Sequence, residues 1–169
     1  MTPQEMIARA KRIARGKTPL ATEVSPGLWV GSEESCQDFD GAVVHACKHP
    51  CFEQERARRE VASGSLAHVE DATNLWLNMY DPPYVIDQRW AFRKVLEWTT
   101  GREKLLTQCN QGFSRSPSLM MAIMHRRGLL QGSDYDTAWK EFELVYPQYR
   151  PSAGMRMWLL EYWPQIIGK

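Results

Sequence analysis

An apolar run in the second half of the chain constrains the fold more strongly than any other feature. Positions 119–124 read Leu-Met-Met-Ala-Ile-Met, within a segment from 117 to 127 that is almost wholly apolar. A helix that is apolar on every side must be buried at the centre of a domain. The run therefore predicts a central buried helix, and Arg126, Arg127 and Gly128 are typical of its C-terminal end.

Shorter apolar and β-branched segments alternate with helical patterns along the rest of the chain. Strands are expected at residues 28–30, 42–47, 75–79 and 104–108, and further helices at 53–62, 87–99, 134–145 and 154–163. Such alternation is typical of an α/β domain whose central, mostly parallel sheet is flanked by helices. The length of 169 residues fits a single domain.

The first residues are interpreted separately, as a basic amphipathic helix at 1–21 that precedes the domain at 22–169. Thr2, Pro3 and Glu5 are typical of a helix start. The basic face carries Arg9, Lys11, Arg12, Arg15 and Lys17. Such a face suits an anionic partner or an organelle-targeting role, but it is more often the solvated side of a docked helix.

Composition excludes several classes of function. The formal net charge is +1, so attraction for anions must be local, and no nucleic-acid partner is expected. No apolar stretch approaches the ~20 residues of a membrane span, and the N-terminus has no apolar signal-peptide core. Four cysteines are too few for a disulfide scaffold in a chain of this length. We therefore expect a cytoplasmic protein without a membrane span, and the oligomeric state stays open.

Three cysteines lie close in the sequence to two histidines. Cys36, Cys47 and Cys51 surround His45 and His49, a pattern that suggests zinc. A structural zinc site normally needs a second cysteine pair or a downstream histidine pair, which is missing here. The preferred interpretation is that these cysteines are small buried residues, so we expect neither a metal site nor a cofactor.

The connection into the buried helix carries the strongest functional signal. Cys109 follows the fourth predicted strand, and Arg115 comes six residues later. The residues between them are Asn110, Gln111, Gly112, Phe113 and Ser114. Backbone N–H groups in a tight loop before a helix favour a bound anion, and the guanidinium of Arg115 can bind two phosphate oxygens. The same positive field favours the thiolate of Cys109, a nucleophile that would face the bound phosphate.

A general acid is expected on an earlier loop. Asp81 follows the third predicted strand, where Pro82 and Pro83 keep the chain out of a helix. Asp87 is the main alternative, although its position is typical of a helix cap. Asp71 precedes the strand and is a further alternative.

The segment from Gln108 to Ser118 resembles the phosphate-binding loop of the protein tyrosine phosphatases, and its ending Ser-Arg-Ser-Pro-Ser is typical of the dual-specificity branch. The similarity covers nearly all of residues 22–164. It implies that 22–169 form a catalytic domain in which Cys109 becomes a phosphocysteine while Arg115 and the loop hold the phosphate oxygens. It also implies that Asp81 acts first as acid and then as base, and that Ser116 hydrogen-bonds the Cys109 sulfur.

One position departs from the family pattern, because Gln108 stands where the family has histidine. Glutamine can donate a hydrogen bond but cannot carry charge, so weaker catalysis is expected. The departure also leaves open a catalytically inactive module that binds phosphoproteins. Sulfur transferases and arsenate-reducing enzymes use cysteine-centred anion loops too, but the acid at a strand end and the C-terminal similarity argue against both.

The loop between Cys109 and Arg115 has no charged side chain, whereas relatives that act on inositol phospholipids or RNA ends usually place Lys or Arg there. The expected substrate is therefore a phosphorylated protein, with phosphotyrosine at least as the substrate residue. Whether phosphoserine and phosphothreonine are also substrates stays open. A lipid, nucleotide or RNA phosphate is the alternative.

Cys47 is a candidate redox partner of Cys109, because its strand is expected to run beside the strand that leads to the nucleophile. An exposed thiolate is readily oxidised to a sulfenic acid that a second thiol captures. The alternative is that Cys47 is only a small buried residue. Cys36 and Cys51 suit the role less, since each is expected in a loop.

Overall fold

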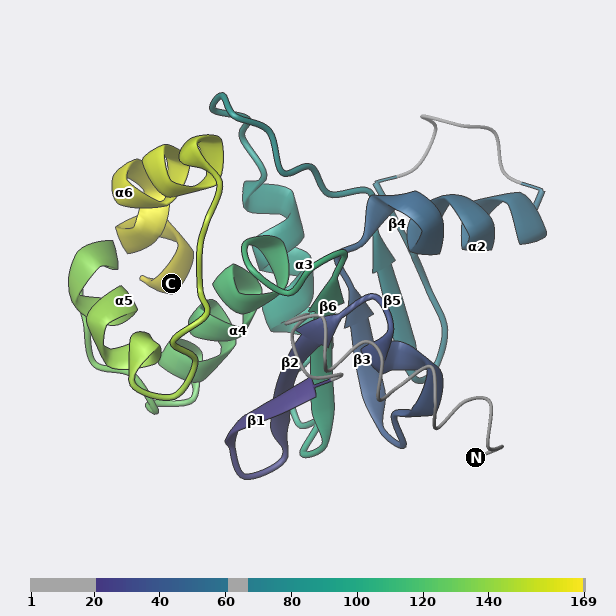
Figure 1. Cartoon of the computed structure of the whole chain (residues 1–169), viewed down its shortest axis with the longest axis horizontal. Coiled ribbons are helices and arrows are strands. Elements are labelled where there is room, and N and C mark those ends of the chain that lie inside the picture. The colour runs from purple at the N-terminus through teal and green to yellow at the C-terminus, as the bar shows by residue number, and fades with distance from the viewer. Residues whose placement is uncertain (1–20, 61–66, 169) are drawn as a thin grey trace.

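Six strands pair into one mixed sheet within the part of the chain that the computed structural model describes, residues 21–60 and 67–168 (Figure 1). The strands are β1 (Ala21–Ser25), β2 (Leu28–Ser32), β3 (Ala42–His45), β4 (His68–Glu70), β5 (Asn74–Leu77) and β6 (Leu105–Cys109). Their order across the sheet is β1-β2-β6-β3-β5-β4. The four inner strands are parallel, and β1 and β4 add antiparallel edges. The mostly parallel sheet that the sequence predicts is therefore confirmed.

Helices cover the sheet and build a second layer beyond it. They are α2 (Glu53–Arg58), α3 (Arg89–Trp98), α4 (Arg115–Arg126), α5 (Tyr135–Glu143) and α6 (Ala153–Ile167), with the short helical turns η1 (Ser35–Asp38) and η2 (Lys48–Phe52). α3 and α4 pack on the sheet, and α5 and α6 pack on α4. Figure 1 shows α2 on the far side of the molecule from α5 and α6.

The predicted buried helix is α4, and its environment explains its composition. Every residue from Arg115 to Met124 is buried, because α4 lies between the sheet and the outer pair α5 and α6. No helix in the described ranges is both long enough and apolar enough to cross a membrane.

The other predicted elements are present with small shifts in their ends, and two strands were missed. The third predicted strand ends at Leu77 instead of residue 79, and the Met79 carbonyl beyond its end accepts a hydrogen bond from Arg115. The edge strands β1 and β4 were not predicted from the sequence. The proposed helix at 1–21 lies outside the described residues, apart from Ala21, which pairs with Gly31 in the sheet.

The alternation of side chains along β6 separates two environments. Leu105 and Cys109 belong to the core beneath the helices, and the Thr107 hydroxyl donates to the Ser116 carbonyl of α4 at 3.0 Å. Successive side chains of a strand point to opposite faces, so Gln108 points away from α4, toward His45 of β3, its register partner. Adjacent residues at the end of β6 therefore serve opposite faces of the sheet.

Candidate active site

Cys109 ends the central strand, and Ser116 lies in the first turn of the helix that follows. The Cys109 Sγ is 3.2 Å from the Ser116 Oγ, and the same hydroxyl lies 3.3 Å from the Gly31 carbonyl oxygen on β2. Cys109 is only 3% exposed. The sulfur–hydroxyl contact that the family resemblance implies is present.

Arg115 is the first residue of α4 and is held by partners from two directions. Its Nη1 donates to the Met79 carbonyl at 3.1 Å, and its Nη2 donates to the Asn110 side-chain oxygen. Its buried Nε finds no hydrogen-bond partner within the described part of the chain. A buried guanidinium N–H needs an acceptor, so a bound oxyanion would supply what this donor lacks.

The loop between these two residues is shaped by a glycine and a buried tyrosine. Gly112 has φ +75°, a conformation that favours glycine. The Tyr146 hydroxyl donates to the Gly112 carbonyl at 2.7 Å, and the Arg150 N–H donates to the Phe113 carbonyl at 2.7 Å. The segment after α5 therefore fixes the curl of the loop.

Replacing Gly112 by alanine is expected to damage both stability and activity. The new Cβ would lie 3.1 Å from the Gly31 carbonyl and from the Tyr146 hydroxyl, and the left-handed backbone adds about 1–2 kcal/mol of strain. Gly101→Ala is the matched control, since Gly101 has φ +78° but open space around its Cβ position. Thermal unfolding should show strain in both variants, whereas a loss of at least about 10-fold in turnover should be confined to Gly112→Ala. Equal turnover in the two variants would contradict this role for Gly112.

Asp81 approaches the loop from the segment after β5. Its Oδ1 accepts a hydrogen bond from the Ser114 hydroxyl at 2.6 Å, and the Ser114 Oγ in turn accepts from the Ser152 N–H at 2.9 Å. Gly154, in the first turn of α6, lies so close to this segment that a Cβ would meet the Tyr84 carbonyl at 2.1 Å. The start of α6 thus positions the Asp81 segment against the loop.

Solved structures share this architecture, although no protein-family model and no curated protein matches the sequence. DUSP15 superposes with a TM-score of 0.61 at 19% identity, covering 86% of this chain and 89% of its own. Human DUSP28 gives 0.59 at 20% identity, covering 86% and 93%. A human tyrosine phosphatase-like serine/threonine/tyrosine-interacting protein gives 0.59 at 21% identity, covering 84% and 94%. The fold is that of the dual-specificity phosphatases.

Within this phosphatase fold, the two alternative acids are engaged elsewhere. Asp87 forms a salt bridge of 2.7 Å with Arg89, and the hydrogen bond from Arg89 lowers the pKa of Asp87 below its ordinary value. Asp71 accepts hydrogen bonds from the N–H groups of Thr73 and Asn74 in the turn before β5. Of the three carboxylates, Asp81 is the one whose hydrogen bond reaches the loop.

The remaining loop residues differ in their contacts and in their exposure to solvent. The Asn110 amide group donates to the Glu33 carboxylate at 2.8 Å and to the His49 carbonyl. Gln111 is exposed, and Phe113 is partly exposed. Asn110 thus connects Arg115 to the segments on the other face of the sheet, a role that no sequence pattern indicated.

Gln108, which stands where the family has histidine, has unexpected neighbours. Its Nε2 lies 2.7 Å from the His45 Nδ1 and 3.4 Å from the Cys51 sulfur. Cys51, which was expected in a loop, therefore approaches the end of β6 at Gln108. The Cys47 thiol donates to the His49 carbonyl at 2.9 Å, and its pairing with Cys109 stays a prediction.

Proposed function

We propose that the chain is a cysteine-dependent phosphatase of phosphoproteins, with phosphotyrosine as its substrate at least. The observation that carries the proposal is the pair of hydrogen bonds beside Arg115. Ser114 binds the Asp81 carboxylate, and Ser116 binds the Cys109 sulfur. A nucleophile, an anion-binding guanidinium and a carboxyl group are thereby held around one loop, which is the set that phosphoryl transfer to a thiol requires.

In the first half-reaction the Cys109 thiolate attacks phosphorus. The S–P bond forms as the P–O bond to the substrate breaks, and protonated Asp81 gives its proton to the departing oxygen, so the product leaves as a phenol or an alcohol. Arg115 and the loop hold the other phosphate oxygens and stabilise the charge that spreads over them. The unpartnered Nε of Arg115 is a donor for one of these oxygens.

In the second half-reaction water attacks the phosphocysteine. Asp81, now a carboxylate, takes a proton from the water as the new P–O bond forms and the S–P bond breaks. The departing sulfur regains its negative charge, and the Ser116 hydroxyl, 3.2 Å away, donates a hydrogen bond to it. Inorganic phosphate then leaves, and the thiolate is restored.

The loop surface supports a phosphoprotein as substrate more than a polyanion. The exposed and partly exposed residues Gln111 and Phe113 are uncharged, whereas a lipid or nucleotide with several phosphates gains affinity from additional cations. All four cysteines are free thiols, which fits the reducing cytoplasm where we place the protein.

An activity panel tests the proposal: a generic aryl phosphate, phosphotyrosine and phosphoserine peptides, an inositol phospholipid and 5′-phosphorylated RNA. We expect turnover of the aryl phosphate and the phosphotyrosine peptide. Preference for phospholipid or RNA would select the alternative substrates. Binding of phosphopeptide without turnover of any compound would select an inactive binding module, which Gln108 and the fold match to a phosphatase-like interacting protein favour.

A further inference from the structure

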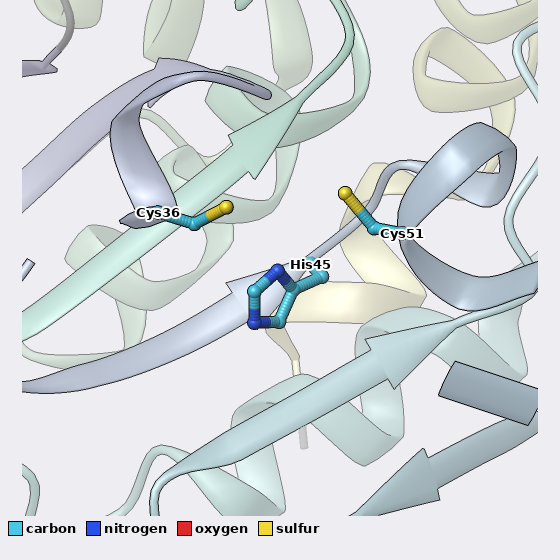
Figure 2. A group of neighbouring side chains, drawn as sticks. All are labelled: Cys36, His45 and Cys51. Atoms are coloured by element: carbon cyan, nitrogen blue, oxygen red, sulfur yellow. The ribbon is translucent and has the colours of Figure 1, made fainter. Parts of the chain in front are cut away.

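Three side chains with metal-binding atoms converge on the face of the sheet opposite Cys109. Cys36 belongs to η1, His45 ends β3, and Cys51 lies in η2. Their ligand atoms all lie within 4.8 Å of one another. Figure 2 shows the two sulfur atoms on either side of the His45 ring, with one ring nitrogen facing the space between them. We propose that Cys36, His45 and Cys51 bind a zinc ion.

The spacing of the three ligand atoms is close to that of a tetrahedral zinc site. Bonds of about 2.3 Å to sulfur and about 2.0–2.1 Å to nitrogen place ligand atoms about 3.5–3.8 Å apart. From separations within 4.8 Å, an inward movement of about 1 Å is sufficient. Cys36 and Cys51 are partly exposed on short helical turns, so side-chain rotation can supply it. Two thiolates and an imidazole form a donor set that suits zinc.

The second shell of His45 matches that of a metal-bound histidine. The His45 Nε2 lies 2.9 Å from the Asn74 side-chain oxygen, which can only accept, so Nε2 carries the proton and Nδ1 keeps its lone pair. Asn74 is itself held by Asp71. Ligating histidines characteristically donate their other N–H to such an acceptor.

Gln108 supplies the fourth position. It is fully buried, and its Oε1 has no hydrogen-bond partner among the residues that the structure describes. Its Nε2 lies 2.7 Å from the His45 Nδ1 and 3.4 Å from the Cys51 sulfur, so the carboxamide adjoins two of the three proposed ligands and would move aside by a small rotation as the ion enters. The two ends of a carboxamide have nearly the same shape. A half-turn of the group would exchange the two atoms and turn the orphaned oxygen toward the ion.

The cluster is open to ions from solution. It lines a pocket of about 460 Å³ to which Glu33, Glu34 and Glu55 also contribute. Carboxylates at the mouth of a pocket raise the local concentration of cations. The Glu55 charge is paired with Arg58 and Arg59, so Glu55 contributes little to this attraction.

When Zn²⁺ binds, the two thiols become thiolates, so the site is neutral and two protons are released. The S–H bonds of Cys36 and Cys51 break, their protons pass to solvent, and two S–Zn bonds form. The ion would tie η1 and η2 to the ends of β3 and β6. Since Gln108 immediately precedes Cys109, and Asn110 contacts Glu33 and His49, the site would brace the phosphate-binding loop from the far face of the sheet.

The test uses the full chain with Cys109→Ser, so that the nucleophile does not compete for metal. The protein is reduced, freed of metal and titrated with Zn²⁺ against a chromophoric chelator. We expect one zinc per chain and a higher thermal midpoint on binding. Co²⁺ in its place should show tetrahedral d–d bands and thiolate-to-cobalt charge transfer. Cys36→Ser and Cys51→Ser should each weaken binding by at least about 100-fold.

His68→Asn is the matched control, because His68 is a histidine of the same sheet outside the ligand set, and it should leave the affinity unchanged. For the fourth ligand, Gln108→Glu should tighten binding and Gln108→Met should weaken it. Failure of the reduced protein to bind one equivalent overturns the proposal, as does unchanged binding in a Cys36→Ser/Cys51→Ser variant. A Cys36–Cys51 disulfide that re-forms in air, in a protein that binds no zinc when reduced, also overturns it and assigns a redox pair instead.

Discussion

The Cys109→Ser variant is expected to lose at least about 1,000-fold in turnover of an aryl phosphate, the scale seen when a covalent nucleophile is removed. The serine hydroxyl can keep the contact with Ser116, but it is not ionised near neutral pH and does not form the covalent intermediate. Arg115 and the loop remain in place, so inorganic phosphate should still inhibit binding of a phosphotyrosine peptide. Steady-state kinetics and competition binding measure the two effects separately.

Cys47→Ser is the control for this substitution under reducing conditions, because it removes a second buried thiol without touching the loop. It should retain turnover. Activity that survives in Cys109→Ser would refute the whole mechanism. Loss of phosphate binding together with loss of turnover would indicate that the substitution collapses the loop.

The Asp81→Asn variant should lose about 100-fold or more on substrates with poor leaving groups, the usual contribution of general acid catalysis. Asparagine keeps an oxygen that can accept from Ser114, as Asp81 does at 2.6 Å, so the segment stays in place while the proton is lost. Activated aryl phosphates, whose leaving groups need no proton, should lose much less. A series of aryl phosphates of increasing leaving-group pKa measures the difference as a slope.

Asp87→Asn is the matched control on the same segment. Asp87 is exposed and paired with Arg89, so its substitution should leave the leaving-group slope unchanged. Equal losses of Asp81→Asn on all leaving groups would give Asp81 a structural role. A steeper slope in Asp87→Asn would transfer the acid function to Asp87.

The sequence predicted the centre of the fold better than its edges, for a physical reason. The strand at Leu105–Cys109 and the helix that follows are buried on all sides, so their composition alone indicates their place. β1 is an antiparallel edge strand, and β4 is the opposite edge strand with only three residues. Their short sequences lack a strong pattern. Their pairing depends on the neighbouring strand more than on local propensity.

The candidate site divides in the same way. The loop from Cys109 to Ser116 is contiguous in sequence, so its chemistry could be predicted from residue types and spacing. The Ser114–Asp81 contact joins residues 33 positions apart, and Cys36, His45 and Cys51 come from three different elements. The sequence pattern suggested zinc but lacked the second cysteine or histidine pair of a structural site, so no metal site was expected. Only the folded chain brings η1 and η2 to the end of β3.

The position of β6 in the sheet also bears on how the protein folds. Thr107 pairs with Val30 of β2 on one side and with Val44 of β3 on the other, so β6 is inserted between strands made much earlier in the chain. Contacts across such long separations form slowly. Until residues 105–109 leave the ribosome, β2 and β3 each present an open, apolar edge to neighbouring chains. The rate at which phosphate binding returns after dilution from denaturant would therefore measure the rate at which the sheet closes. Binding of chaperones to the chain should be greatest just before that step.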